Sequence, residues 1–249
     1  MALDNIFMIR GKCDLIRIGQ NNDGGYLICN KSLIETKYLV SIGISDDFSF
    51  EENFLKMSNE KINIRCYDDV LNEFFLFKRL IISFLRAIYK KDFKIFKSQI
   101  IKTANYIKLK KKITFNKKKI QSGDLDIILK EINDNKIYLK IDIEGAEYNL
   151  LDEILKNQKK LHGLIIEFHD CDLNKNKIKD FISKFEIPLV HIHGNNFAPL
   201  DDEQNPTVLE ITFDKYSTNF DGKINLPNKL DMPNNPNQNE ILIKYKNFI

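Results

Sequence analysis

Leu139-Lys140-Ile141-Asp142-Ile143-Glu144-Gly145-Ala146-Glu147-Tyr148 is the stretch that decides the fold. A short apolar strand runs into acidic residues, a glycine follows, and a helix then begins near a glutamate. In an open α/β sheet, ligands bind in the crevice beyond the carboxyl ends of the strands. Carboxylates delivered to that edge can hold a hydroxyl group, a cation or a metal ion; the alternative is a turn with a few solvated acids. Asp142, at the end of the strand, is therefore the first candidate site residue.

The rest of the chain indicates a parallel sheet covered by helices, because short apolar runs alternate with segments of helical spacing. Four of these runs resemble buried strands, at residues 38–42, 62–67, 137–141 and 164–168. Two further strands, at 189–193 and 208–213, are joined by a loop short enough for antiparallel pairing. We therefore expect an α/β fold with a mostly parallel sheet and one antiparallel edge strand.

The length of 249 residues predicts a single domain, residues 1–249, with three additions. Residues 1–35 form an N-terminal β-hairpin extension, and residues 214–249 form a C-terminal tail, rich in Asn and Pro, that wraps the surface. Residues 70–112 are a helical insertion with apolar side chains at spacings of three and four. These are Phe74, Phe77, Ile81, Phe84, Leu85 and Ile88. We expect this stripe to pack in the core; the alternatives are a lid or a dimer-forming helical hairpin.

Composition is that of an ordinary globular protein, with 43% hydrophobic and 29% charged residues. The net charge of +3 is too small to indicate a nucleic acid partner. Lysines crowd residues 108–119, a run that can meet phosphate or acidic lipid but is more often a solvated face. The four cysteines show no metal-finger spacing and are predicted to be thiols in a reducing compartment. With no signal sequence and no transmembrane segment in the pattern, we expect a cytoplasmic protein.

A second candidate site follows the first long strand, at Gly43, Ile44 and Ser45. A glycine at a strand end lets the backbone approach a ligand closely. Asp68 ends the next strand, where a carboxylate can accept both hydroxyls of a ribose. The dinucleotide fingerprint GxGxxG is absent, so the pattern favours a nucleoside without a pyrophosphate.

The third candidate site contains histidines. Glu167 and His169 end one predicted strand, and His193 ends another. Together with Asp142 they form a plausible set of ligands for a divalent metal ion such as Mg²⁺ or Mn²⁺. The same residues also suit a general base with an orienting carboxylate. Asp170 and Asn195 lie beside these strand ends and are candidate substrate-binding residues.

On these residues the chain resembles S-adenosylmethionine-dependent methyltransferases of the FkbM family, within the class I Rossmann-like methyltransferases. The segments that carry the resemblance are spread over nearly the whole chain: residues 22–26, 41–47 with Phe50-Glu51, 139–147, 166–170, 226–227 and 230–235. One departure is Gly43-Ile44-Ser45, which lacks the second glycine of the usual methyltransferase loop.

The resemblance implies a Rossmann-like sheet of seven strands, with S-adenosylmethionine over the ends of the first two. Residues 43–45 would line the methionine moiety, Asp68 would hold the ribose, and Ser122 and Asp124 would lie near the adenine. Asp142 would face both the cofactor and the acceptor, and His169 would act as base or metal ligand with Asp142 and His193 as partners.

The predicted function is O-methylation of a sugar hydroxyl, on a nucleotide-linked sugar for a surface (capsular) polysaccharide. Glu144 is assigned to substrate binding, whereas Glu147 is expected to start the helix, where its charge suits the helix dipole. The alternatives are an O-methyltransferase for a lipid or small natural product, a non-catalytic Rossmann-like binding module, and a metal-dependent hydrolase. A homo-oligomer formed through the helical insertion is a further expectation.

Overall fold

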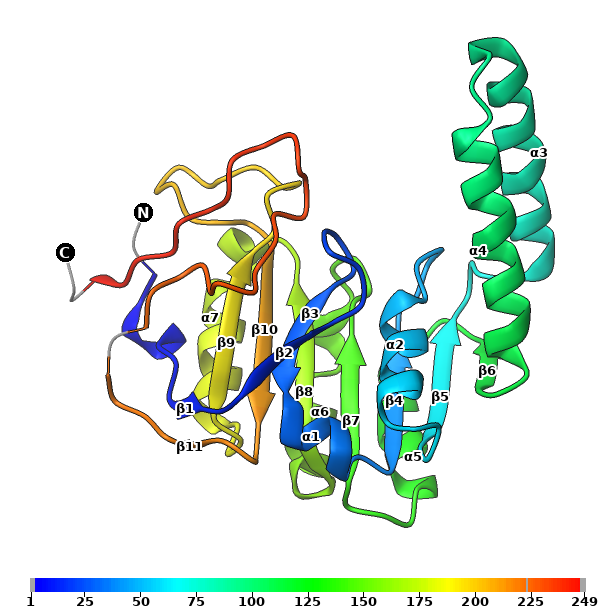
Figure 1. Ribbon diagram of the computed structural model, residues 1–249. Coiled ribbons are helices and arrows are strands. Elements are labelled where there is room, and N and C mark those ends of the chain that lie inside the picture. Colours follow the sequence, from blue (N-terminus) through cyan, green and yellow to red (C-terminus); the bar gives the residue numbers. More distant parts are fainter. Residues whose placement is uncertain (1–2, 223, 247–249) are drawn as a thin grey trace.

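The computed structural model describes residues 3–222 and 224–246, and its centre is a sheet of seven strands in the order β6-β5-β4-β7-β8-β10-β9 (Figure 1). β4 pairs in parallel with β5 and β7, and β7 pairs in parallel with β8. β10 is antiparallel to both of its neighbours, β8 and β9. This order, with its single reversed strand, confirms the class I methyltransferase fold that the sequence predicts.

The strands of this sheet are β4 (Tyr38–Ile42), β5 (Asn63–Asp68), β6 (Thr114–Lys117), β7 (Ile137–Ile141), β8 (Leu161–Phe168), β9 (Leu189–Gly194) and β10 (Leu209–Asp214). Every residue of β7, β8, β9 and β10 is buried, because helices or loops cover both faces of the sheet there. Continuous apolar runs, rather than alternating ones, are the sequence signal of such strands.

Two apolar cores lie on the two faces of the sheet. One contains α5 (Asp124–Glu131), α6 (Leu151–Asn157) and α7 (Cys171–Lys184). The other contains α1 (Asn30–Glu35), α2 (Ser49–Met57) and the strands β2 (Leu15–Ile18) and β3 (Tyr26–Cys29). Short 3₁₀ helices lie at η1 (Asn5–Phe7), η2 (Glu147–Asn149) and η3 (Gln158–Lys160).

The hairpin of β2 and β3 crosses one face of the sheet (Figure 1). The hydroxyl of Thr212 in β10 donates to the carbonyl of Leu27 at 2.8 Å, which fixes the hairpin over the sheet. Two further strands, β1 (Gly11–Lys12) and β11 (Thr218–Asn219), pair beside it. The turn end of the hairpin is thereby held at the carboxyl ends of the central strands, where the hydroxyl of Tyr26 lies 3.1 Å from Asp142 Oδ2.

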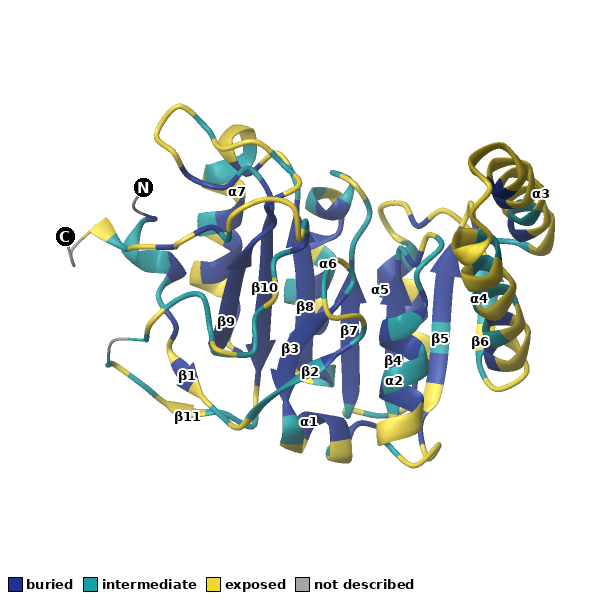
Figure 2. Ribbon diagram, turned by 45° about the horizontal axis from the view of Figure 1, so that its top comes forward, coloured by how far each residue is buried: buried dark blue, intermediate teal, exposed yellow. Residues whose placement is uncertain are grey.

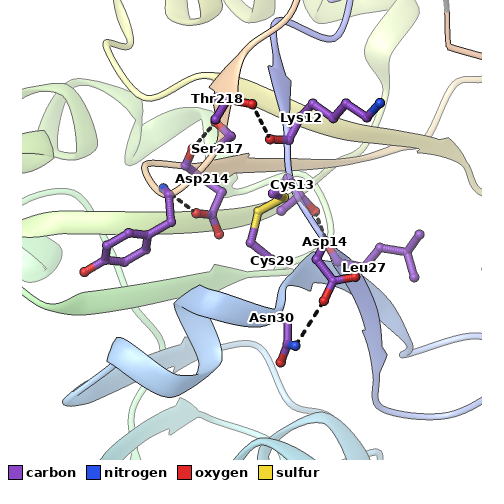
Figure 3. The surroundings of a disulfide bond; sticks show 11 residues. Lys12, Cys13, Asp14, Leu27, Cys29, Asn30, Asp214, Ser217 and Thr218 are labelled. Carbon is purple, nitrogen blue, oxygen red and sulfur yellow. Dashed lines mark hydrogen bonds between the residues drawn. A yellow bond between two sulfur atoms is a disulfide. The ribbon is translucent and has the colours of Figure 1, made fainter.

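Cys13 and Cys29 form a disulfide that closes the base of this hairpin (Figure 3). Their Cα atoms lie 5.8 Å apart, as is usual for a disulfide. The prediction that all four cysteines are thiols is therefore wrong for this pair, while Cys66 and Cys171 are free and buried. Because disulfides persist mainly in oxidising compartments, the pairing removes one of the two grounds on which a cytoplasmic location was predicted.

The helical insertion is an antiparallel hairpin of α3 (Glu73–Lys90) and α4 (Lys94–Lys110) that projects beyond the end of the sheet (Figure 1). The stripe predicted to pack in the core is instead exposed, by 76% at Phe74 and 59% at Leu85. Only a narrow opposite face of the hairpin, with Leu76, Ala87 and Tyr106, is buried (Figure 2). Within the described residues, no helix is apolar over enough of its length to span a bilayer.

Thiol chemistry tests the disulfide. Alkylation of the denatured, unreduced protein is expected to modify Cys66 and Cys171 alone, and all four cysteines after reduction, as read by intact mass. The bridged cysteines are 16 residues apart, so reduction is expected to cost about 3 kcal/mol of unfolding free energy. Modification of all four cysteines before reduction would contradict the pairing.

Candidate functional site

The centre of the site is the point where the chain leaves β4 at Gly43. Gly43 has a φ of 78°, a left-handed conformation that glycine adopts without penalty. A Cβ atom there would overlap the carbonyl oxygen of Asp142, which follows β7. The backbone therefore passes directly against the end of the neighbouring strand, and both segments line one cavity.

Asp68, the last residue of β5, fixes the loop that follows Gly43. Its Oδ2 accepts hydrogen bonds from the backbone N–H groups of Ile44 at 3.0 Å and Ser45 at 2.7 Å. Its Oδ1 accepts from Val70 and Leu71 at 2.8 and 2.6 Å. The carboxylate thus ties the ends of β4 and β5 together at the wall of the cavity.

The cavity at this edge has a volume of about 420 Å³. Its walls come from the ends of four adjacent strands and include Gly43, Ser45, Asp68, Asp69, Val70, Lys118, Lys119, Ile120, Asp142 and Glu144. Ile44 is buried behind the wall. Ser122 and Asp124 are not lining residues; Asp124 pairs with the lining residue Lys118 at 2.7 Å.

Lys140 is a buried cation directly beneath this edge. Its Nζ donates to the carbonyl oxygen of Gly43 at 2.9 Å and lies 3.8 Å from Asp142 Oδ2. Burial alone would lower the pKa of Lys140, but the negative charges of Asp142, Glu51 and Glu167 outweigh it and raise the pKa. The ammonium group is therefore charged and holds the loop carbonyl and the carboxylate in place.

A second cavity of about 380 Å³ adjoins the first, and Asp142 and Glu144 line both. Its walls are mostly polar and consist of Asp23, Asp142, Glu144, Glu167, His169, Asn195, Phe197, Ala198 and Val208. The structure therefore brings together Asp142, Glu144, Glu167, His169 and Asn195, which the sequence predicted as site residues.

Glu147 holds the imidazole of His169. One of its oxygens accepts from the His169 backbone N–H at 2.7 Å and lies 3.3 Å from the ring Nδ1. The other ring nitrogen, Nε2, is 3.4 Å from Glu144 and 3.8 Å from Glu167. Burial alone would lower the pKa of His169, but the bond to Glu147 and the charges of Glu167 and Asp142 raise it to about 9.

Glu167 is a buried carboxyl group inside the second cavity. The amide of Asn195 donates to its Oε1 at 2.9 Å, and the Tyr26 hydroxyl lies 3.0 Å from its Oε2. The same hydroxyl is 3.1 Å from Asp142 Oδ2. Burial and the nearby negative charges of Asp142 and Glu210 raise the pKa of Glu167 well above its usual value.

Two predicted residues lie outside this cavity. His193 is buried, and its two ring nitrogens contact Glu210 at 3.1 Å and Glu240 at 3.0 Å, so it anchors the C-terminal tail instead of facing His169. Asp170 is exposed at the start of α7 with a φ of 49°. The prediction that His193 lies beside His169 is wrong because the two histidines belong to β9 and to the end of β8, and β10 lies between these strands.

The residues that can hold a divalent cation are Asp142, Glu144 and His169. Each offers one ligand atom, and these atoms all lie within 4.8 Å of one another. Glu147 holds the Nδ1 side of the ring, which leaves Nε2 toward the carboxylates, as is common for a metal-binding histidine. Two oxygens and one imidazole nitrogen fit Mn²⁺ or Mg²⁺. Glu167 is instead engaged by Asn195 and Tyr26.

Among the residues at the site that were not predicted to act there are Tyr26, Lys140 and Glu147. Glu147 was expected to start a helix, and it does begin η2, but its side chain is fully buried and braces His169. Tyr26 reaches the site from the hairpin, 116 residues before Asp142. The sequence signal for Lys140 is a charged residue inside an otherwise apolar strand, a position where an unpaired charge would be costly.

No protein-family model matches the chain, and no curated protein matches it. Among solved structures it is similar to the methyltransferase FkbM from Methylobacillus flagellatus KT, at 16% identity and a TM-score of 0.35, over 71% of this chain. The match spans 44% of that protein. It is also similar to the fibrillarin pre-rRNA processing protein from Methanococcus jannaschii, at 10% identity and a TM-score of 0.40, over 85% and 84% of the two chains.

A third similar structure is a SAM-dependent O-methyltransferase from Thermotoga maritima, at 12% identity and a TM-score of 0.35, over 82% and 78% of the two chains. The strand order of the sheet defines the fold class, and the chemistry must be argued from the site itself.

Stability as a function of pH tests the buried position of His193. Burial alone would lower its pKa, but the bonds to Glu210 and Glu240 raise it to about 10. In the unfolded chain the pKa of His193 is about 6.5. The stabilisation that follows from the raised pKa in the folded protein is fully present below this pH, and it is lost as the pH rises through the folded pKa of about 10. His193→Gln is expected to unfold more easily at neutral pH and to lose less stability on alkalinisation, as measured by urea denaturation. Parallel pH dependences of the two proteins would contradict this arrangement.

Proposed function

We propose that the protein is an S-adenosylmethionine-dependent O-methyltransferase whose acceptor is a sugar hydroxyl. The observation that carries the proposal is that two adjoining cavities at the carboxyl edge of the sheet share Asp142 and Glu144. Such an edge is where α/β sheets bind their ligands. A methyl donor in one cavity and an acceptor in the other would meet at these shared residues.

The cavity beside Gly43 suits the cofactor. Its backbone wall at Gly43 and Ser45 admits the methionine moiety. Asp68 and Asp69 place carboxylates on this wall for the ribose. Because four backbone N–H groups already donate to Asp68, a ribose hydroxyl would share its oxygens with the loop. Ile120 supplies an apolar surface for the adenine. Of the residues assigned to the adenine by resemblance, Asp124 acts here only through its ion pair with Lys118.

The second cavity suits a sugar. Carboxylates and the amide of Asn195 can bind several hydroxyl groups, and Phe197, 57% exposed, offers a flat apolar surface to a sugar ring. Its carboxylates would repel a phosphate, so the diphosphate of a nucleotide-linked sugar would lie outside the cavity. The family resemblance implies methylation of hydroxyls on sugars or natural products, and within that range we assign the sugar to surface polysaccharide synthesis.

His169 is the proposed base. In the reaction, the acceptor oxygen attacks the methyl carbon, the bond from that carbon to sulfur breaks, and the hydroxyl proton moves to Nε2 of the neutral form of His169. Because the pKa of His169 is about 9, this neutral form is the minor one at neutral pH, and the rate of methyl transfer is expected to rise with pH up to about 9. The products are the methyl ether and S-adenosylhomocysteine. Glu147 holds the opposite nitrogen of the ring and stabilises the imidazolium that forms. Glu144, beside Nε2, would position the acceptor.

A divalent cation bound by Asp142, Glu144 and His169 would lower the pKa of an acceptor hydroxyl. The side chain of Glu144 is 88% exposed, so it can adjust to a ligand without disturbing the core. In that case His169 would serve as a ligand, and a carboxylate would take the proton.

One alternative, a lipid or natural-product acceptor held by the helical stripe, has less support. None of the residues that line the two cavities belongs to α3 or α4. A non-catalytic binding module would leave the pair of buried Glu147 and partly exposed His169 without a chemical role.

Calorimetry with S-adenosylhomocysteine tests the cofactor cavity. Asp68→Asn is expected to weaken binding about tenfold or more, because it removes a charged hydrogen-bond acceptor, which contributes about 1.5–3 kcal/mol, and loosens the loop that Asp68 holds through Ile44 and Ser45. Asp69→Asn, on the same wall, is the matched control and should bind like the unmodified protein. If Asp69→Asn weakened binding and Asp68→Asn did not, the ribose contact would belong to Asp69. If the unmodified protein did not bind S-adenosylhomocysteine, the proposal would be rejected.

Methyl transfer tests His169. A screen of nucleotide sugars with S-adenosylmethionine, read by mass spectrometry, should give a product with a single added methyl group. His169→Ala should reduce the rate at least about a hundredfold while S-adenosylhomocysteine still binds. Full activity of this variant would reject the assignment of His169.

Metal titration tests the candidate cation site. Mn²⁺ binding, followed by calorimetry, is expected to weaken about tenfold or more in Glu144→Gln, because removal of a ligand charge lowers the affinity. Glu203→Gln, which changes an exposed acid elsewhere, is the control. If Mn²⁺ does not bind and a chelator leaves methyl transfer unchanged, His169 acts as a base without a metal ion.

A further inference from the structure

The hairpin of α3 and α4 carries most of the exposed apolar surface in the described part of the chain. Of the twenty-two large hydrophobic residues that are exposed there, thirteen lie in this hairpin. They are Phe74, Phe77, Ile81, Ile82, Phe84, Leu85, Ile88, Tyr89, Phe93, Ile95, Ile100, Ile101 and Ile107. Apolar surface on this scale, gathered in one place, marks an interaction site.

On α3 the exposed apolar residues form a stripe. Phe74, Phe77, Ile81, Leu85 and Ile88 recur at spacings of three and four, so they share one helix face. The buried residues of α3, Leu76, Ser83 and Ala87, lie on the opposite face, and α4 is the helix that packs against α3. The stripe continues onto α4, where Phe96 contacts Phe84 with ring centroids 5.1 Å apart.

The hairpin is also strongly basic. Residues 73–110 contain ten Lys and Arg but only two acids, Glu73 and Asp92, whereas the whole chain has a net charge of only +3. The lysines at its tip, Lys90, Lys91, Lys94 and Lys97, are all exposed. The remainder of the protein is therefore net acidic, and the positive charge is concentrated on the hairpin, where the apolar side chains are exposed. Figure 2 shows that most of this hairpin is exposed.

We propose that this hairpin docks the protein on an anionic lipid bilayer, with its apolar stripe inserted at the interface and its lysines on the lipid headgroups. A helix that combines a basic surface with exposed Phe, Leu and Ile is typical of interfacial membrane binding. A second copy of the chain is a poorer occupant, because two such hairpins would bring like charges together. A nucleic acid would use the lysines but leave most of the aliphatic residues exposed to water.

The hairpin is also coupled to the cofactor cavity. It leaves the sheet just after Asp68 ends β5, at the edge that carries both cavities (Figure 1). Arg79 of α3 and Lys102 of α4 both pair with Asp46, the residue after Ser45. A bilayer bound to the hairpin would therefore lie on the side of the sheet where ligands enter. Docking itself does not depend on the proposed methyl transfer.

Vesicle sedimentation of the full chain tests the docking. The protein is expected to bind vesicles of phosphatidylcholine with about a third phosphatidylserine, to bind pure phosphatidylcholine at least about tenfold more weakly, and to lose affinity in high salt. Phe77→Glu with Leu85→Glu should weaken binding about tenfold or more, and so should Lys90→Glu with Lys97→Glu.

Matched controls change the same chemistry elsewhere on the surface. Leu173→Glu alters a residue that is 79% exposed on α7, and Lys215→Glu with Lys229→Glu reverses two exposed charges outside the hairpin; both should bind like the unmodified protein. Thermal unfolding verifies that each variant is folded.

Three results would overturn the proposal. The first is that the unmodified protein does not bind anionic vesicles. The second is that the control variants lose as much vesicle affinity as the hairpin variants. The third is that the protein binds no vesicles but forms a dimer in sedimentation equilibrium, which Phe77→Glu with Leu85→Glu converts to a monomer. Binding to single-stranded RNA but not to vesicles would likewise assign the surface to a nucleic acid.

Discussion

The close approach of Gly43 to the carbonyl oxygen of Asp142 is the constraint on which the site depends. β4 and β7 are neighbours in the middle of the sheet, and only a residue without a side chain lets the chain leave β4 so near the end of β7. Lys140 holds this arrangement through the Gly43 carbonyl. Because Asp142 also lines the second cavity, one backbone contact fixes the two ligand sites relative to each other.

This constraint explains which parts of the site could be predicted from sequence. Parallel strands in a covered sheet deliver their last residues to one edge, so apolar runs that end in Asp142, Glu167 and His169 predict a cluster. The contributions of Tyr26 and Glu147 could not be predicted in this way. Tyr26 comes from a hairpin outside the sheet, and a glutamate that braces a histidine is indistinguishable in sequence from one that complements a helix dipole.

The helical hairpin shows a different limit of sequence patterns. An amphipathic stripe has the same period whether it faces a core or a membrane, so the spacing of Phe77, Ile81 and Leu85 predicted burial that the structure does not have. The more informative signal was the charge on the same helices. A helix buried on most sides carries few lysines, whereas this hairpin has ten basic residues in 73–110.

Charge separation links the hairpin to the site. The second cavity gathers the acids Asp23, Asp142, Glu144 and Glu167 at the carboxyl edge of the sheet, whereas the hairpin is basic. The hairpin begins after β5 ends at this same edge (Figure 1). An anionic surface would be attracted to the hairpin and repelled from the cavity. The cavity would therefore stay open to an uncharged part of an acceptor, such as a sugar ring, while the hairpin engages negative charge. The negative charge of the acids in the cavity would also raise the local concentration of cations at Asp142 and Glu144.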